Sequence, residues 1–197
     1  MGAYLDIYGL TSYRDEGTLN HFIDTYVDRD AAEDRLSDDL LTLIPLDRKH
    51  DAGRYLSNEA HSEALQKDAR YRKQWYEHEM EPALSLANVV KRGLDYPRRS
   101  FTVYLPHRRK DLHLESSAII RFTVDDHVIF GLGMRDTDKN IKRARRDLLP
   151  SLMAGYKCKM GMVAVEFPPP ISEHEFRKSK HNAFVLYFKE GDLEIVK

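Results

Sequence analysis

Residue types that could carry out chemistry are present, but their spacing fits no common catalytic or binding motif. Gly131 and Gly133 follow a strand-like run and precede a helical one, as the glycines of a dinucleotide-binding loop do. The third glycine of that motif is missing, because position 136 is Asp, whose charge would oppose a phosphate at the start of a helix. The two glycines instead predict a place where a neighbouring strand approaches closely.

The histidines do not show the spacing of a metal site. A zinc-protease helix needs a second histidine one turn after a His-Glu pair, but Lys178 occupies that position after His174-Glu175. Ser172 and Glu175 are instead typical of a capping box at the start of a short helix. We therefore predict no metal ligand and no cofactor.

A catalytic nucleophile is equally hard to find. The single cysteine, Cys158, lies between Lys157 and Lys159, and nearby cations favour the reactive thiolate. Neighbours along a strand point to opposite faces, however, so we interpret Cys158 as a structural thiol. One cysteine makes no internal disulfide and favours the reducing cytoplasm. We predict no catalytic residue, and an enzyme whose site is assembled only by the fold remains an alternative.

Charge is balanced overall but uneven along the chain. The formal net charge is -1, yet residues 1–47 contain 11 acidic and 3 basic side chains, and the remainder contains 21 acidic and 28 basic ones. Such asymmetry favours recognition of a partner of opposite charge, although the two parts could also neutralise each other. The acids that we predict to bind a partner are Asp24, Asp28, Asp30, Glu33, Asp34, Asp38 and Asp39.

This acidic segment makes a protein-binding module our leading hypothesis for function. Complementary charge mainly raises the rate of association and the selectivity for a partner. A small cytoplasmic protein that neutralises a basic partner, of the toxin–antidote kind, would have these properties. The sequence identifies neither the partner nor the oligomeric state.

Clusters of arginine and lysine support an alternative function, which is binding of an anion or a nucleic acid. A helix crowded with basic residues can follow a phosphate backbone. Cations in the first turns of a helix also oppose its dipole, which indicates a compensating acid or anion nearby. The candidate residues are Arg98, Arg99, Arg108, Arg109, Arg143 and Arg146.

Hydrophobic periodicity predicts the elements that position these residues. Helices are expected over 17–28, 58–81, 85–94 and 137–156, with a further short one from 172 and a loop or short helix over 29–39. Strands are expected over 3–10, 40–46, 99–105, 117–124, 127–134, 160–167 and 183–189. Asp125-Asp126 joins two of these strands into a hairpin, and Pro150 is expected to kink or split the long helix.

These elements predict an α+β fold with a mixed sheet and flanking helices. We expect one domain over 1–197, with a division into lobes 1–82 and 83–197 as an alternative. Ile7-Tyr8-Gly9-Leu10 resembles Ile129-Phe130-Gly131-Leu132, and each is followed by an amphipathic helix and a buried strand. This similarity indicates an internal duplication, two units that pair in one sheet, or coincidence. Mean hydropathy is -0.58 and no apolar run approaches about 18 residues, so we expect neither a signal peptide nor a membrane span.

Overall fold

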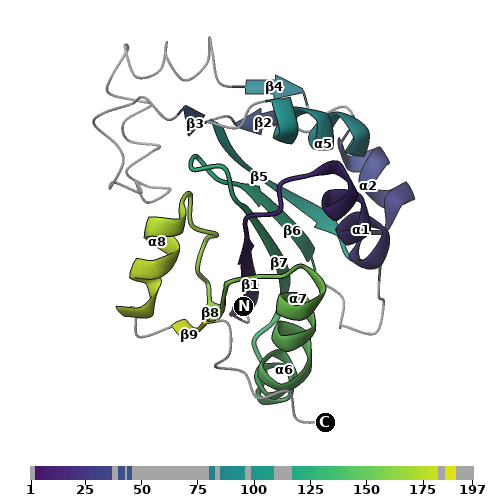
Figure 1. Cartoon of the computed structure of the whole chain (residues 1–197). Coiled ribbons are helices and arrows are strands. Elements are labelled where there is room, and N and C mark those ends of the chain that lie inside the picture. Colours follow the sequence, from purple (N-terminus) through teal and green to yellow (C-terminus); the bar gives the residue numbers. More distant parts are fainter. Residues whose placement is uncertain are drawn as a thin grey trace, which may run out of the picture.

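A seven-stranded sheet runs through the part of the chain that the computed structural model describes (Figure 1). The described residues are 3–36, 40–42, 44–45, 80–82, 85–95, 99–108, 117–181 and 185–189. The strand order is β3-β5-β6-β7-β1-β8-β9, and each neighbouring pair is antiparallel. The strands are β1 (Tyr4–Thr11), β3 (Ile44–Pro45), β5 (Arg99–Pro106), β6 (Ser117–Phe122), β7 (Val128–Arg135), β8 (Met160–Val165) and β9 (Val185–Lys189). Strands β2 (Leu40–Thr42) and β4 (Met80–Pro82) form a separate antiparallel pair.

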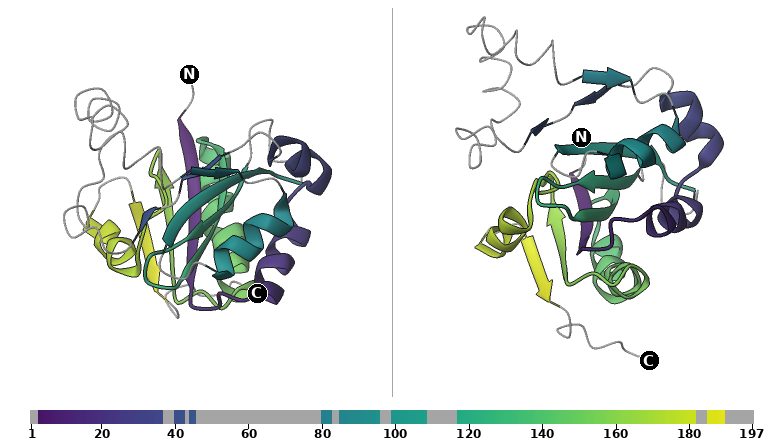
Figure 2. Two further views of the ribbon diagram at one scale, coloured as in Figure 1. Left: turned by 90° about the horizontal axis from the view of Figure 1, so that it is seen from above. Right: turned by 45° about the horizontal axis from the view of Figure 1, so that its top comes forward.

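Helices pack on both faces of this sheet. The helical segments are α1 (Glu16–Tyr26), α2 (Arg29–Leu36), α5 (Leu86–Asp95), α6 (Asp138–Arg143), the π-helical turn η1 (Ala144–Leu148), α7 (Leu149–Gly155), α8 (Glu173–Lys178) and the 3-10 turn η2 (Ser179–His181). Side chains of α1, α2, α5 and α7 pack on what we call the first face. Helix α8 packs through Phe176 on the second face, so it lies on the opposite side of the sheet from α1 and α5 (Figure 2).

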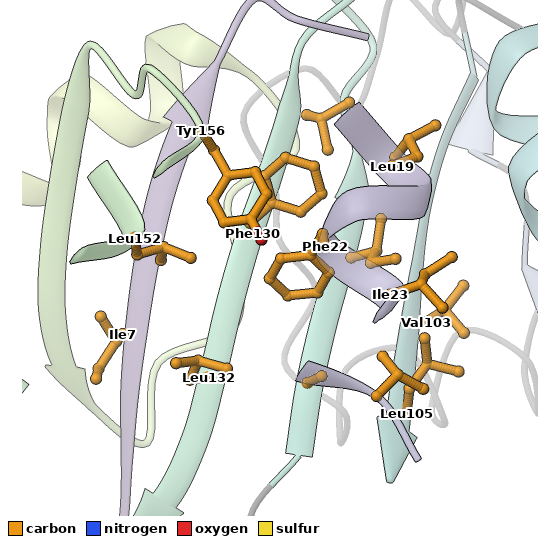
Figure 3. Close-up of a cluster of buried hydrophobic side chains, with 14 of the residues drawn as sticks. Ile7, Leu19, Phe22, Ile23, Val103, Leu105, Phe130, Leu132, Leu152 and Tyr156 are labelled. Carbon is orange, nitrogen blue, oxygen red and sulfur yellow. The ribbon is translucent and has the colours of Figure 1, made fainter. Parts of the chain in front are cut away.

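The main core lies between the first face and its helices, and its centre is aromatic. The rings of Phe22 and Phe130 stack with their centroids 4.4 Å apart, and the ring of Tyr156 lies 4.9 Å from that of Phe130 (Figure 3). Leu19 and Ile23 continue the buried stripe of α1 toward β5. The helical spacing seen in the sequence therefore marks the side of α1 that faces the core.

Several local predictions are confirmed. Helix α5 begins after Ser85, whose Oγ accepts a hydrogen bond from the backbone N–H of Asn88 at 3.1 Å. Thr137 caps α6 in the same way, with its Oγ1 3.1 Å from the N of Asn140. The α+β class is confirmed, as are the β6–β7 hairpin and the interruption of the long helix before Pro150 by η1. No described helix combines the length and apolar character that a bilayer crossing requires.

The region before α5 differs from prediction. The single strand expected over 40–46 is wrong, because β2 pairs with β4 whereas β3 pairs with β5. These partners belong to different sheets, so the run is divided between them. The helix expected over 58–81 lies outside the described residues apart from its last two positions, which belong to β4. The segment over 29–39, expected as a loop or short helix, contains α2.

The two similar segments of the sequence pair with each other in the sheet. Ile7 lies opposite Leu132 and Tyr8 lies opposite Gly131, so β1 and β7 align along the repeated motif. Strand β1 also pairs with β8, and it therefore separates the two strands that α6 and α7 connect. Pairing of the two units is thus observed, whereas the duplication and the division into lobes stay predictions.

The close approach predicted at the β7 glycines is confirmed. A Cβ added to Gly131 would lie 2.7 Å from Cδ1 of Tyr8, so the aromatic ring occupies the space above the glycine. A Cβ added to Gly133 would lie 2.6 Å from Oγ of Ser117 and 3.1 Å from Oδ1 of Asp6. These glycines therefore let side chains from β1 and β6 lean over β7.

Candidate functional site

The structure places five of the seven predicted partner-binding acids on α1 and α2 or between them. Asp24 lies near the end of α1, Asp28 precedes α2, and Asp30, Glu33 and Asp34 belong to α2. All five side chains are exposed or half-exposed. Asp38 and Asp39 lie outside the described residues.

Three of these acids also stabilise local structure. Asp24 accepts two hydrogen bonds from Arg29, the shorter of which joins Nη2 to Oδ1 at 2.6 Å. Asp28 Oδ1 lies 3.3 Å from the N of Ala31 in the first turn of α2. Both carboxylate oxygens of Glu33 accept from the N–H of Leu86, at the start of α5. The acids therefore organise the helices as well as giving them negative charge.

The structure separates those predicted anion-binding residues that it describes. Arg108 follows β5 and lies against α1, where its Nη1 donates to the carbonyl of Asp24 at 2.7 Å. Arg143 and Arg146 lie in the helical segment after β7. The backbone of Arg99 belongs to β5, and Arg98 and Arg109 lie outside the described residues. Arg108 thus belongs to the edge of the acidic helices.

A polar group that sequence reasoning missed lies on the second face, and we call it the Asp6 cluster: Asp6, Tyr8 and Glu166. Burial raises the pKa of Asp6 to about 7, although contacts with the Phe167 backbone and the Tyr8 side chain lower it, while the charge of Glu166 adds to the rise. The Tyr8 hydroxyl donates to the carbonyl of Phe167 at 2.8 Å. The Asp6 carboxyl group can therefore exchange a proton near neutral pH. The contact of Tyr8 with Phe167 also holds the segment that follows β8.

A second missed group connects the β6–β7 turn, the start of β8 and α8. We call it the His127 cluster: Asp125, His127, Lys159 and Glu173. Lys159 Nζ lies 2.8 Å from His127 Nε2 and 2.6 Å from Glu173 Oε2. His127 Nε2 lies 3.3 Å from the same Glu173 oxygen, and His127 Nδ1 lies 3.4 Å from Asp125 Oδ1.

The two carboxylates of the His127 cluster stay ionised at neutral pH. Burial would raise the pKa of Asp125, but contacts with the side chains of His127 and Thr123 and with the backbone of Glu173 lower it to about 2. The pKa of Glu173 is also lowered, chiefly by the hydrogen bond from Lys159 and also by Arg177. The Lys159 ammonium group therefore holds the N-terminal end of α8 beside the β6–β7 hairpin.

The environment of Cys158 agrees with a structural thiol. The side chain is buried, and burial raises its pKa to about 12, so the thiol is protonated at neutral pH. Lys157 lies over the ring of Tyr13, with Nζ 4.8 Å from the ring centroid, and Lys159 contacts Glu173. Among the described residues, no group of three or more His, Cys, Asp or Glu is placed to hold a metal ion.

Part of the signal for these missed clusters was present in the sequence. Strand alternation puts Asp6 and Tyr8 on the same face of β1, and Asp125 and His127 flank one turn. Their partners are far apart in the chain, however, and only strand order brings them together. Comparisons with protein-family models, with curated proteins and with solved structures give no match for this chain.

Proposed function

We propose that the chain is a protein-recognition module in which α1 and α2 present negative charge to a basic protein partner. One observation carries the proposal: residues 15–36 contain seven acidic side chains and two arginines. All seven acids are exposed or half-exposed. Helices α1 and α2 lie beside the sheet (Figure 2). A surface of this kind attracts a partner before contact is made.

The structural contacts of these acids are compatible with such a role. A carboxylate that caps a helix, as Asp28 and Glu33 do, keeps its full charge, because the backbone N–H groups are neutral. Only ion pairs such as Asp24 with Arg29 cancel charge locally. Long-range attraction depends on the net charge that remains, so capping does not remove it.

The proposal is tested by reversing two exposed acids of α2. Asp30→Lys combined with Asp34→Lys should lower the association rate with the partner about tenfold at low ionic strength and flatten its salt dependence. The partner is first recovered from cells of the source organism with the chain as bait. Association rates are then measured with the purified pair over a range of salt concentrations.

A matched control is available on the helix after β7. Asp138→Lys with Asp147→Lys reverses the same number of charges at exposed positions of α6 and η1. This control should leave the association rate unchanged or slightly raised. Equal association rates in the wild type and the Asp30/Asp34 variant would remove the proposal.

A second candidate function, binding of a polyanion, is favoured by α6 and η1. Lys139, Lys142, Arg145 and Arg146 are exposed there, and Arg143 is half-exposed. An oligonucleotide probe should then bind at low salt and dissociate steeply as salt rises, and Lys142→Glu with Arg146→Glu should abolish binding. Absence of binding at low salt in a filter assay would exclude this function.

A further inference from the structure

The His127 cluster contains a contact that depends on the protonation of one imidazole. Lys159 Nζ lies 2.8 Å from His127 Nε2, and an ammonium group has donors only. His127 Nε2 must therefore accept, so the neutral ring carries its proton on Nδ1, which is buried without a hydrogen-bond partner among the described residues and lies 3.4 Å from Asp125 Oδ1. The geometry thus selects one tautomer of a neutral histidine.

We propose that His127 is a pH-sensitive switch that exchanges the partner of Glu173 at the start of α8. Protonation would place an N–H on Nε2 directly against the Lys159 ammonium, and the two cations would repel each other. Glu173 Oε2 lies 3.3 Å from the same nitrogen and is placed to accept that proton. Glu173 then pairs with His127, and Lys159 moves toward solvent.

The charged groups around His127 determine the two states of the switch. Asp125 faces Nδ1 from the turn, Lys159 faces Nε2 from the start of β8, and Glu173 faces Nε2 from α8. Arg177 binds the other oxygen of Glu173, at 2.9 Å from Nε to Oε1, so it stays paired in both states. Asp126, in the same turn, lies 3.5 Å from Arg14.

The exchange changes what fastens α8 to the sheet. Glu173 is the first residue of α8, and its backbone N–H donates to Asp125 Oδ2 at 2.7 Å. In the neutral state Lys159 connects β8 to α8, whereas in the protonated state the hairpin alone makes the ionic connection.

The first test measures the tautomer in the intact native protein. Nitrogen-15 NMR of the histidine rings at about pH 8 should show His127 with its proton on Nδ1. Exposed His174, on α8, serves as an internal reference in the same spectrum. A proton on Nε2 of His127 at this pH would overturn the proposal, and this measurement needs no variant.

The second test measures the interaction of the two side chains. A double-mutant cycle of His127→Leu and Lys159→Met, followed by urea unfolding, gives their coupling. The coupling should stabilise the fold at a pH where the ring is neutral and change sign at a pH where it is charged, with the charge of the ring read from the nitrogen-15 spectrum. A cycle with His174→Gln in place of His127→Leu should show no coupling at either pH. A coupling of the same sign and size at both pH values would overturn the switch.

Discussion

At the scale of single residues, Asp6 shows how burial and hydrogen bonding compete over one carboxyl group. Burial favours the neutral acid, whereas the Phe167 backbone and the Tyr8 side chain favour the carboxylate. Burial is the stronger effect, since the pKa of Asp6 is raised to about 7. This balance comes from the position of β1 between β7 and β8, which encloses the side chain.

The raised pKa of Asp6 predicts a change of stability with pH. The folded state binds more protons than the unfolded state between the ordinary value of 3.8 and about 7, so stability falls as pH rises through this interval. Asp6→Asn removes this loss. As pH rises from acid to alkaline, the free energy of unfolding of Asp6→Asn should increase by about 1 to 3 kcal/mol relative to that of the wild type. This range allows for the partial exposure of Asp6.

Urea unfolding of the wild type and Asp6→Asn across this pH range measures the effect. Asp30→Asn, at an exposed position of α2, is the matched control and should show no such trend. If the stability curves of the wild type and Asp6→Asn run parallel at all pH values, the ionisation of Asp6 carries no energetic cost.

At the scale of elements, glycine in a helix reports how closely that helix packs. A Cβ added to Gly93 in α5 would lie 2.1 Å from ring atoms of Phe122. That ring is held by Phe101, 4.6 Å away between centroids, and by the guanidinium of Arg14, 5.2 Å from its centroid. The ring cannot yield without disturbing the contact of α5 with β6.

Two glycine-to-alanine substitutions should therefore have opposite effects. Gly93→Ala should destabilise the fold by about 3 kcal/mol, because overpacking exceeds the gain in helix propensity. Gly155→Ala, at the end of α7, meets nothing within 4 Å and should stabilise by up to about 1 kcal/mol. Thermal unfolding of both variants measures the difference, and similar effects at both positions would contradict the close packing of α5.

The interruption of the long helix is also decided within one element. Pro150 has no N–H to donate, so regular α-helical bonding to the carbonyl of Arg146 is lost. The π-helical turn η1 ends at Leu148, and the N–H of Leu149 bonds to the carbonyl of Ala144, five residues earlier. This shift of bonding lets the helix continue through α7.

At the scale of the whole molecule, strand order places the functional candidates. Strand β1 pairs with β7 and β8, which lie more than a hundred residues later in the chain. Helices α1, α2 and α5 therefore pack on the first face, while the Asp6 and His127 clusters surround the segment that leads to α8 on the second. The acidic helices therefore lie on the opposite side of the sheet from α8.

Local patterns in the sequence were sufficient to predict most of the helices and strands and where they begin and end. Caps such as Ser85 and Thr137, the stripe of α1 and the alternation of β6 and β7 depend on residues within a few positions of each other. The division of residues 40–46 between two sheets could not be predicted, because it depends on which distant strands pair with each part.

The acidic segment was visible in the sequence because charge adds up along neighbouring residues whatever the fold. The Asp6 and His127 clusters were not, because they join residues such as His127, Lys159 and Glu173 from separate elements. A hydrogen bond or a raised pKa depends on distances of a few ångströms and on exclusion of water. Only packing of the strands and α8 sets those distances, and therefore only the tertiary structure decided where protons and charges can be exchanged.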